Sequence, residues 1–167
     1  MILWLVGMMG SGKTSAGRTA SAGLGVPFQD TDSVVEAASG RTVAEIWETD
    51  GEAAFRRLEV EAVAGVSRGS GIVATGGGVV LDEGNRERMR NGPVVWLQAS
   101  PTTLAHRLIG QVVRPGMAAV KESPEEFLRD VLAARAHLYE AVATHRIEID
   151  AMGEKSVAAA VEVIWND

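Results

Sequence analysis

Cysteine is absent from this chain of 167 residues, which excludes disulfide bonds, thiolate metal sites and cysteine-based catalysis. Long apolar runs are absent too, and none approaches the roughly 20 residues that a membrane-spanning helix needs. Basic residues are fewer than acidic ones, 16 against 22, and the formal net charge is -6. This balance argues against a surface that binds nucleic acid or an anionic membrane. Since no basic leader precedes the first apolar run, we expect a cytoplasmic protein.

The composition is otherwise typical of one globular domain, with 46% hydrophobic and 23% charged residues. Short apolar runs alternate with helical stretches, which predicts an α/β domain over residues 1–167 with a parallel sheet. We expect strands over residues 2–6, 26–28, 71–74, 94–97 and 146–149. We expect helices over residues 13–23, 33–39, 42–49, 52–66, 83–91, 101–108, 124–142 and 154–165.

The segment from Gly7 to Thr14 reads Gly-Met-Met-Gly-Ser-Gly-Lys-Thr and matches the P-loop pattern G-x-x-x-x-G-K-[ST]. It lies between an expected strand and an expected helix, which is the context that the motif requires. Its glycines let backbone N–H groups turn toward a phosphate, and the helix N-terminus adds partial positive charge. Lys13 can reach the outer phosphates, and the Thr14 hydroxyl can hold Mg²⁺. The segment predicts a nucleotide site; an ordinary strand–helix turn is the alternative.

Two carboxylates, Asp30 and Asp32, come at the expected end of the second strand, where α/β sheets present ligand-binding groups. Residues two positions apart on a strand share a side, so both side chains are expected to face the phosphate site. One would hold Mg²⁺ through water, and the other would orient or deprotonate an attacking hydroxyl. Helix capping is the alternative, because a helix is expected to begin here.

The helix expected over residues 52–66 has an apolar stripe that includes Phe55, and Arg56 and Glu59 flank this stripe. A half-buried arginine beside a pocket can bind a carboxylate or phosphate of a substrate bidentately. The alternative is a structural ion pair of Arg56 with Glu52 or Glu59.

The triplet Gly76-Gly77-Gly78 directly follows the expected third strand. Three glycines at the end of a central strand are unfavourable unless the backbone must approach something closely. A substrate packed against bare amides is the functional interpretation, and a tight turn is the alternative.

Two segments exceed a minimal strand–helix alternation. Residues of about 33–67 hold two or three helices between neighbouring strands, and this insertion, which contains Trp47, can cap a second substrate. Residues of about 109–122 carry two glycines and a proline, and such a segment can close over the site as a lid. An arginine such as Arg114 would then neutralise a transferring phosphoryl group. A plain surface connection is the alternative.

In combination, these motifs resemble those of the shikimate kinases, a family of P-loop kinases with a nucleoside-monophosphate-kinase-like fold. The resemblance covers nearly the whole chain. Besides the P-loop, its motifs are Phe28-Gln29-Asp30-Thr31-Asp32, Asp50-Gly51-Glu52-Ala53-Ala54-Phe55-Arg56, Gly76-Gly77-Gly78, Arg114-Pro115 and Arg135-Ala136-His137-Leu138-Tyr139. It implies a three-layer fold whose parallel sheet has five strands in the order 2-3-1-4-5. It also implies phosphorylation of the 3-hydroxyl of shikimate by ATP and Mg²⁺, on the route to chorismate and the aromatic amino acids.

The resemblance further implies which residues bind the nucleotide. The phosphates of ATP would be held by Gly10, Ser11, Gly12, Lys13, Thr14 and Ser15. Arg107 would lie near the adenine, and Arg114 would come in with the lid to stabilise the transferring phosphoryl group. Thr14 would bind Mg²⁺ directly, and Asp30 would bind it through water.

For the acceptor, the resemblance implies a second set of residues. These substrate-binding residues would be Asp32, Trp47, Phe55, Arg56, Glu59, Gly76, Gly77, Gly78 and Arg135. Asp32 would hydrogen-bond the ring hydroxyls and orient or activate the 3-hydroxyl, while Arg56 and Arg135 would bind the carboxylate. The glycine amides would pack on the ring, and Trp47 and Phe55 would form an aromatic wall.

The lid departs from the family pattern at two places. Gly116 follows Arg114-Pro115 where the family usually has leucine, which removes apolar contact from the closed lid. Leu108 stands where the family usually has a more polar start to the lid. We expect a monomer whose partner is the small molecule shikimate, with neither nucleic acid nor membrane as partner. A kinase of a related cyclic polyol or sugar acid, such as gluconate, and a non-catalytic nucleotide-binding switch are the alternative functions.

Overall fold

The computed structural model describes residues 1–109 and 123–167. Its strands form one sheet: β1 (Ile2–Val6), β2 (Phe28–Asp30), β3 (Gly71–Ala74), β4 (Val94–Gln98) and β5 (His145–Glu148). The strand order is β2-β3-β1-β4-β5, and every neighbouring pair is parallel. This confirms the α/β class, the parallel sheet and the order that the resemblance implied.

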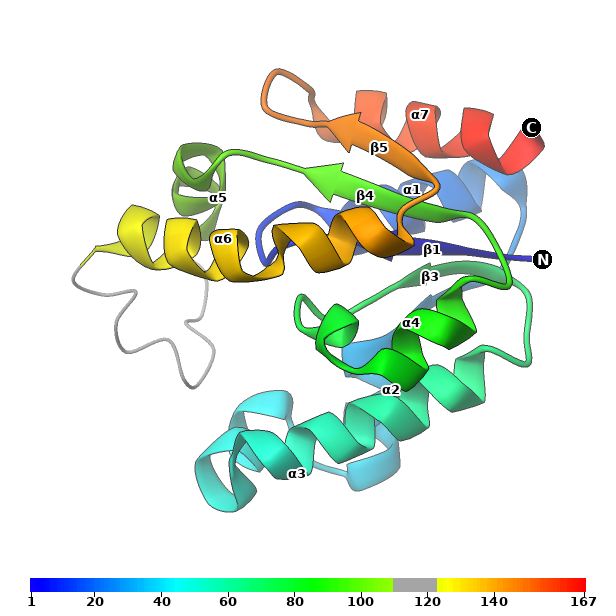
Figure 1. Cartoon of the computed structure of the whole chain (residues 1–167). Coiled ribbons are helices and arrows are strands. Elements are labelled where there is room, and N and C mark those ends of the chain that lie inside the picture. The colour runs from blue at the N-terminus through cyan, green and yellow to red at the C-terminus, as the bar shows by residue number, and fades with distance from the viewer. Residues whose placement is uncertain (110–122) are drawn as a thin grey trace.

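Helices cover the sheet in two layers and extend beyond one of its edges. They are α1 (Lys13–Leu24), α2 (Thr31–Ser39), α3 (Val43–Val66), α4 (Glu83–Met89), α5 (Pro101–Leu108), α6 (Pro124–Val142) and α7 (Glu154–Asn166), with a 3₁₀ turn, η1 (Val79–Leu81). Figure 1 shows α4 and α6 in front of the sheet, α1 and α7 behind it, and α2 and α3 at the β2 edge. Within the described residues, no helix is both long and apolar enough to cross a lipid bilayer.

The central strands are buried because helices lie on both sides of them. All residues of β1 and β3 are buried, as are four of the five residues of β4. Side chains such as Leu3, Leu5 and Ile72 have no exposed surface. The near-continuous apolar runs that predicted these strands therefore reflect burial on both faces of the sheet.

The second strand lies two residues later than the sequence predicts. Val26 N donates to the Ser21 carbonyl, so Val26 belongs to the turn that closes α1. The ladder begins when Ile72 N donates to the Pro27 carbonyl, and β2 runs from Phe28 to Asp30. The expected strand over residues 26–28 was therefore wrong, because hydrogen bonds of the helix end take precedence over the apolar pattern at Val26.

The span Val43–Val66 of the insertion consists of two helical halves that meet at Gly51, which confirms the two helices expected over residues 42–49 and 52–66. α3 runs from Val43 to Val66, but Gly51 lies outside helical conformation at φ 80° and ψ 174°. The sequence predicts this interruption, since glycine adopts positive φ readily. A small buried cluster joins α2 to both halves of α3; its members are Val35, Val43, Ile46, Phe55 and Ala62. The insertion thus has a core of its own, set apart from the core around the sheet.

Gly71, the first residue of β3, offers a test of how tightly the sheet is packed. It has φ of 115°, and an added Cβ would lie 2.2 Å from the Pro27 carbonyl oxygen. We expect Gly71→Ala to lower the free energy of unfolding by about 2 kcal/mol or more, because backbone must move. The measurement is urea denaturation followed by circular dichroism.

Gly65→Ala is the matched control. Gly65 lies in α3, and a Cβ there meets nothing within 4 Å. We expect this variant to be more stable than the wild type by up to about 1 kcal/mol, because alanine reduces the entropy of the unfolded chain and favours helix. Equal effects of the two substitutions would contradict the described packing at Gly71.

Candidate active site

The carboxyl ends of the strands open into a cavity of about 660 Å³. The P-loop after β1 forms its floor, the Asp30–Asp32 turn after β2 lies beside it, and Thr75 and Gly77 follow β3. Residues of α5 and the loop before α7 close the other side. Ligands bind at this edge of open α/β sheets, so the cavity is the natural candidate for the active site.

The P-loop has the backbone that its glycines permit. Gly10 and Gly12 have φ of 77° and 83°, so a side chain would be strained at either position. Lys13 is buried and its Nζ donates to the carbonyls of Gly7 and Met8, at 2.9 and 2.8 Å. Its ammonium is thus held on the loop itself, where phosphate oxygens can replace the carbonyls as acceptors. This geometry supports phosphate binding by the segment that the sequence singles out.

Asp30 connects the P-loop to α2. Its Oδ2 accepts a 2.7 Å hydrogen bond from Thr14 Oγ1, and its Oδ1 accepts from the backbone N–H of Asp32 at 3.0 Å. Asp30 is both the last residue of β2 and the N-cap of α2, so capping and site placement are realised together. The strand argument for Asp32 was wrong, because Asp32 lies in the first helical turn, yet it still lines the cavity.

Thr14 and Asp30 together offer oxygen ligands suited to Mg²⁺. A hydroxyl and a carboxylate oxygen lie 2.7 Å apart at the cavity wall. Mg²⁺ prefers oxygen ligands and usually keeps several waters or phosphate oxygens besides one or two protein groups. No group of three or more acidic or histidine side chains suited to a metal occurs in the described part of the chain. The residues present therefore fit a magnesium ion shared with a nucleotide.

Arg107 lies on the opposite side of the cavity from the two aspartates. Its Nη2 donates to the carbonyls of Ile149 and Met152, at 3.4 and 3.3 Å, which anchors it to the loop before α7. Leu108 packs near the P-loop, since a Cβ on Gly10 would lie 3.3 Å from its Cγ. Arg107 thus lines the cavity beside the P-loop, and its position next to a nucleobase stays a prediction.

The glycine loop, Gly76–Gly78, packs closely against three neighbours. The N–H of Gly76 donates to Oγ1 of the fully buried Thr31 at 3.0 Å. A Cβ on Gly77 would lie 3.3 Å from Met9 N in the P-loop, and a Cβ on Gly78 would lie 2.3 Å from the Arg56 guanidinium. The close approach that the three glycines predict is therefore present. Thr31 was missed, although its position between Asp30 and Asp32 could have drawn attention to it.

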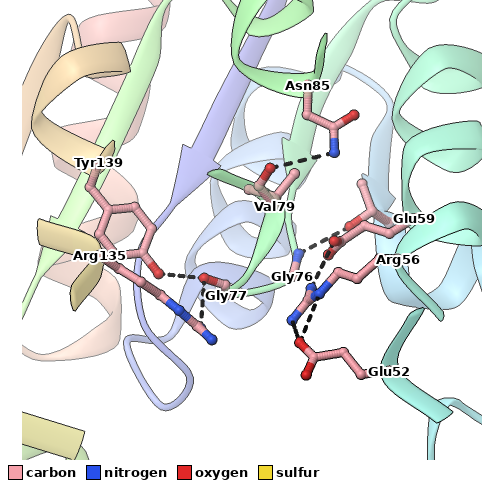
Figure 2. Close-up of polar contacts among 10 residues, drawn as sticks. Glu52, Arg56, Glu59, Gly76, Gly77, Val79, Asn85, Arg135 and Tyr139 are labelled. Carbon is pink, nitrogen blue, oxygen red and sulfur yellow. Dashed lines mark hydrogen bonds and ion pairs between the residues drawn. The ribbon is translucent and has the colours of Figure 1, made fainter. Parts of the chain in front are cut away.

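Arg56 and Glu59 form an ion pair next to the glycine loop (Figure 2). Arg56 Nη1 donates to Glu59 Oε2 at 2.8 Å, and its Nε and Nη2 donate to Glu52 Oε1 at 3.2 and 3.1 Å. Glu59 is only 1% exposed, and burial raises its pKa although Arg56 opposes this shift. The ion pairs that the sequence offers as an alternative to substrate binding both exist.

The rings of Trp47 and Phe55 pack against each other, and the Arg56 guanidinium lies over both of them. Their ring centroids are 5.8 Å apart, and the Arg56 guanidinium lies 5.7 and 5.3 Å from the two rings. Phe55 is buried, whereas Trp47 keeps part of its surface exposed. An aromatic wall on this side would therefore consist mainly of Trp47, with Phe55 supporting it.

Two side chains of α6 reach the other side of the glycine loop. Arg135 Nη1 donates to the Gly77 carbonyl at 3.3 Å, and the Tyr139 hydroxyl donates to the same oxygen. Figure 2 shows Arg135 and Arg56 on opposite sides of this loop. The structure thus groups Asp32, Arg56 and Arg135 around the glycine loop. Of the expected acceptor residues, only Asp32 and Gly77 line the cavity, whereas Trp47, Phe55, Arg56, Glu59, Gly76, Gly78 and Arg135 do not. Arg114, Gly116 and most of the expected lid lie outside the described residues.

Comparison with known proteins identifies close relatives along the full chain. A family model described as "Shikimate kinase" matches residues 9–165. A shikimate kinase of Symbiobacterium thermophilum is 45% identical over 163 residues, which cover 96% of this chain and 94% of that protein. One of Mycobacterium avium is 42% identical over 145 residues, covering 86% and 81%. A solved structure, the shikimate kinase of Acinetobacter baumannii in complex with shikimate, has a TM-score of 0.91 and 34% identity, covering 99% of this chain and 93% of that one.

The buried ion pair generates a prediction about stability and pH. In Arg56→Met, Glu59 loses its closest positive charge, so we expect the free energy of unfolding at neutral pH to fall by about 2–4 kcal/mol. The pKa of Glu59 is already raised by burial and should rise further in this variant. A raised folded-state pKa means that stability is lost as pH rises through it, so the deficit should shrink on going from about pH 8 to pH 5.5.

Arg57→Met is the control for this experiment, because Arg57 is the neighbouring residue of α3 and is exposed. We expect it to change the free energy of unfolding by less than about 0.5 kcal/mol at both pH values. Urea denaturation at the two pH values measures both variants. A deficit in Arg56→Met that does not depend on pH would show that Glu59 is not the group responsible.

Proposed function

The chain belongs to the shikimate kinase family, and on that premise we propose how its own residues transfer a phosphoryl group. It is a kinase that uses ATP to phosphorylate the 3-hydroxyl of shikimate. The observation that carries the proposed arrangement is the glycine loop, which lies against the P-loop backbone and between Arg56 and Arg135. An acceptor seated there would lie directly beside the terminal phosphate of a nucleotide on the P-loop.

We assign the nucleotide to the P-loop side of the cavity. The amides of residues 10–15 and the Lys13 ammonium would hold the phosphates, and Arg107 would lie against the base. Thr14 and Asp30 would hold Mg²⁺, the second of them through water, and the ion would offset charge on the β- and γ-phosphates. The contact between Thr14 and Asp30 supports this assignment.

The acceptor is assigned to the glycine loop and the insertion. Arg56 and Arg135 would bind the shikimate carboxylate from two sides, and the ring would pack on Gly76–Gly78 with Trp47 beside it. Asp32 would accept hydrogen bonds from the ring hydroxyls. The proximity of Asp32 and Glu59 to Gly76, where a Cβ would lie 3.0 and 2.5 Å from their oxygens, supports this placement.

In the reaction, the 3-hydroxyl oxygen forms a bond to the γ-phosphorus while the bond from that phosphorus to the β,γ-bridging oxygen breaks. The hydroxyl proton passes to Asp32, and ADP leaves with the bridging oxygen. Lys13 stabilises negative charge on the transferring group. Arg114 is assigned the same task from the lid by resemblance alone, since it lies outside the described residues.

A different acceptor is the main competing proposal. A cyclic polyol or sugar acid such as gluconate would use the same phosphate chemistry, whereas a nucleotide switch would give no acceptor-dependent turnover. The pairing of Arg56 and Arg135 around the glycine loop favours an acceptor that bears a carboxylate, a group that shikimate, quinate and gluconate share, so the kinetic comparison decides among them. Four expectations stay predictions: a monomer, a cytoplasmic location, no nucleic-acid or membrane partner, and a division of the domain into core, insertion and lid.

The first test is ADP release from ATP and Mg²⁺ with shikimate, quinate, gluconate or no acceptor. We expect strong stimulation by shikimate. If another acceptor stimulates ADP release instead, the substrate is that acceptor and not shikimate. If no acceptor stimulates ADP release, a non-catalytic nucleotide-binding switch is favoured.

Arg135→Ala should raise the KM for shikimate by about 10- to 100-fold, because a charge-assisted pair with the carboxylate is lost. Arg129→Ala, an exposed arginine on the same helix paired with Glu125, should leave the kinetics unchanged.

The second test separates the two aspartates by titrating Mg²⁺ at saturating ATP and shikimate. Asp30→Asn keeps an oxygen near Thr14 but removes the charge, so half-maximal activity should require about 5- to 10-fold more Mg²⁺. Asp32→Asn should lower kcat by about 100-fold or more at every Mg²⁺ concentration, because the proton acceptor is lost. Rescue of both variants by Mg²⁺ would contradict the proposed division of tasks.

A further inference from the structure

Tyr139 has no assigned task in the proposed reaction, yet its hydroxyl contacts the glycine loop on which the acceptor is proposed to pack. The side chain is fully buried, and its ring stacks on Trp96 with centroids 5.6 Å apart. The hydroxyl donates to the carbonyl of Gly77, which also accepts from Arg135 Nη1. Tyr139 and Arg135 are one helical turn apart on α6, so this helix holds one carbonyl of the glycine loop with two donors (Figure 2).

The direction of this hydrogen bond is fixed by chemistry. A carbonyl oxygen can only accept, so the hydroxyl proton of Tyr139 must point at Gly77. Burial raises the pKa of Tyr139 to about 12, so the hydroxyl keeps this proton throughout the physiological pH range. The sulfur of Met8 lies 3.8 Å from the same oxygen, but a thioether is a weak acceptor and the single proton is already donated. The hydroxyl oxygen also interacts with the Arg135 guanidinium, which opposes the rise of its pKa. Tyr139 therefore donates to the Gly77 carbonyl and contacts one of the two arginines proposed to bind the substrate carboxylate.

The glycine loop has particular need of such an anchor. Three consecutive glycines restrict their own backbone less than any other residues would. Gly76 is held by Thr31, but the N–H groups of Gly77 and Gly78 donate no hydrogen bond to other described residues. Two backbone bonds hold the ends of the loop, since Val79 N donates to the Gly76 carbonyl and Leu81 N to the Gly78 carbonyl. A turn closed in this way still allows two orientations of its central peptide, here the one between Gly77 and Gly78. The contacts of the Gly77 carbonyl with α6 favour one of these orientations.

Peptide geometry carries the effect of this contact to the acceptor side. In a planar trans peptide, the carbonyl oxygen and the following N–H point in opposite directions. When Tyr139 holds the Gly77 oxygen toward α6, the N–H of Gly78 points away from α6. Gly78 is the glycine against which the Arg56 guanidinium lies. The hydroxyl of Tyr139 therefore governs a backbone donor next to the arginine proposed to bind the substrate carboxylate.

We propose that Tyr139 is a positioning residue for the acceptor: its hydroxyl sets the orientation of the Gly77–Gly78 peptide and thereby the surface on which shikimate packs. This inference rests on the proposed function, since the glycine loop must be the acceptor surface. It differs from a purely structural task, which the buried, stacked ring could perform without a hydroxyl. Removal of the oxygen alone separates the two.

The test compares Tyr139→Phe with Trp96→Phe in the full chain. Tyr139→Phe keeps the ring and removes only the hydroxyl, so the stack on Trp96 remains. We expect the KM and the calorimetric Kd for shikimate to rise by about 5-fold, the effect of one lost hydrogen bond, while the KM for ATP stays within about twofold. Trp96→Phe disturbs the packing of Tyr139 but leaves its hydroxyl, so it should lower the melting temperature without raising the KM for shikimate.

Each outcome has one interpretation. If the wild type shows no shikimate-dependent turnover, the proposed function fails and the inference about Tyr139, which rests on it, is overturned with it. If the wild type is active and Tyr139→Phe has an unchanged KM and Kd for shikimate, the positioning inference is overturned. Parallel rises for shikimate and ATP, or equal kinetic effects of the two variants, would also overturn it, because they would indicate general loosening. Circular dichroism of both variants verifies that they fold.

Discussion

The structure depends on a close backbone contact between two loops that follow neighbouring strands. β1 and β3 pair in parallel, and Thr75 donates to the Leu5 carbonyl through both its backbone N–H and its hydroxyl. The P-loop and the glycine loop leave the sheet from these positions, about one strand spacing apart. Gly77 then lies so near Met9 N that no side chain would fit without displacement. In the proposed arrangement this contact brings the phosphate donor and the acceptor together, and a side chain at Gly77 would require the P-loop backbone to shift by a few tenths of an ångström.

Much of the fold could be predicted from the sequence, because its signals are local. The P-loop pattern and the buried apolar runs place β1, β3 and β4, and the Ser-Pro starts give the N-termini of α5 and α6. The strand order came only from the family resemblance, since local patterns carry no information about which strands pair. Val26 was misplaced because a hydrogen bond to the preceding helix end decided its structure.

The residues of the candidate site that belong to sequence motifs could be predicted. The residues that reach the site through contacts between distant segments could not. Asp32 was correctly placed at the cavity for a wrong reason, because a helix, and not a strand, presents it. Thr31 and Tyr139 act through backbone atoms of distant glycines, and no spacing in the sequence reveals that. From the sequence, ion pairing and substrate binding are alternative tasks for Arg56. In the structure its guanidinium pairs with Glu52 and Glu59, and its five N–H groups are enough to bind a ligand as well.

The separate buried cluster of the insertion has a consequence for where substitutions in this chain take effect. The cluster around Ile46 and Phe55 in α2 and α3 is distinct from the core that supports the P-loop. Substitutions within it can reshape the floor under Trp47 and Arg56 while the phosphate-binding backbone keeps its support. This separation holds only on the α3 side of the cluster, because Val35 belongs to α2, whose N-cap is Asp30 and whose first turn carries Asp32. Substitutions in α3, at Ile46 or Phe55, are therefore the changes that can alter the proposed acceptor surface while α2 keeps both aspartates in place.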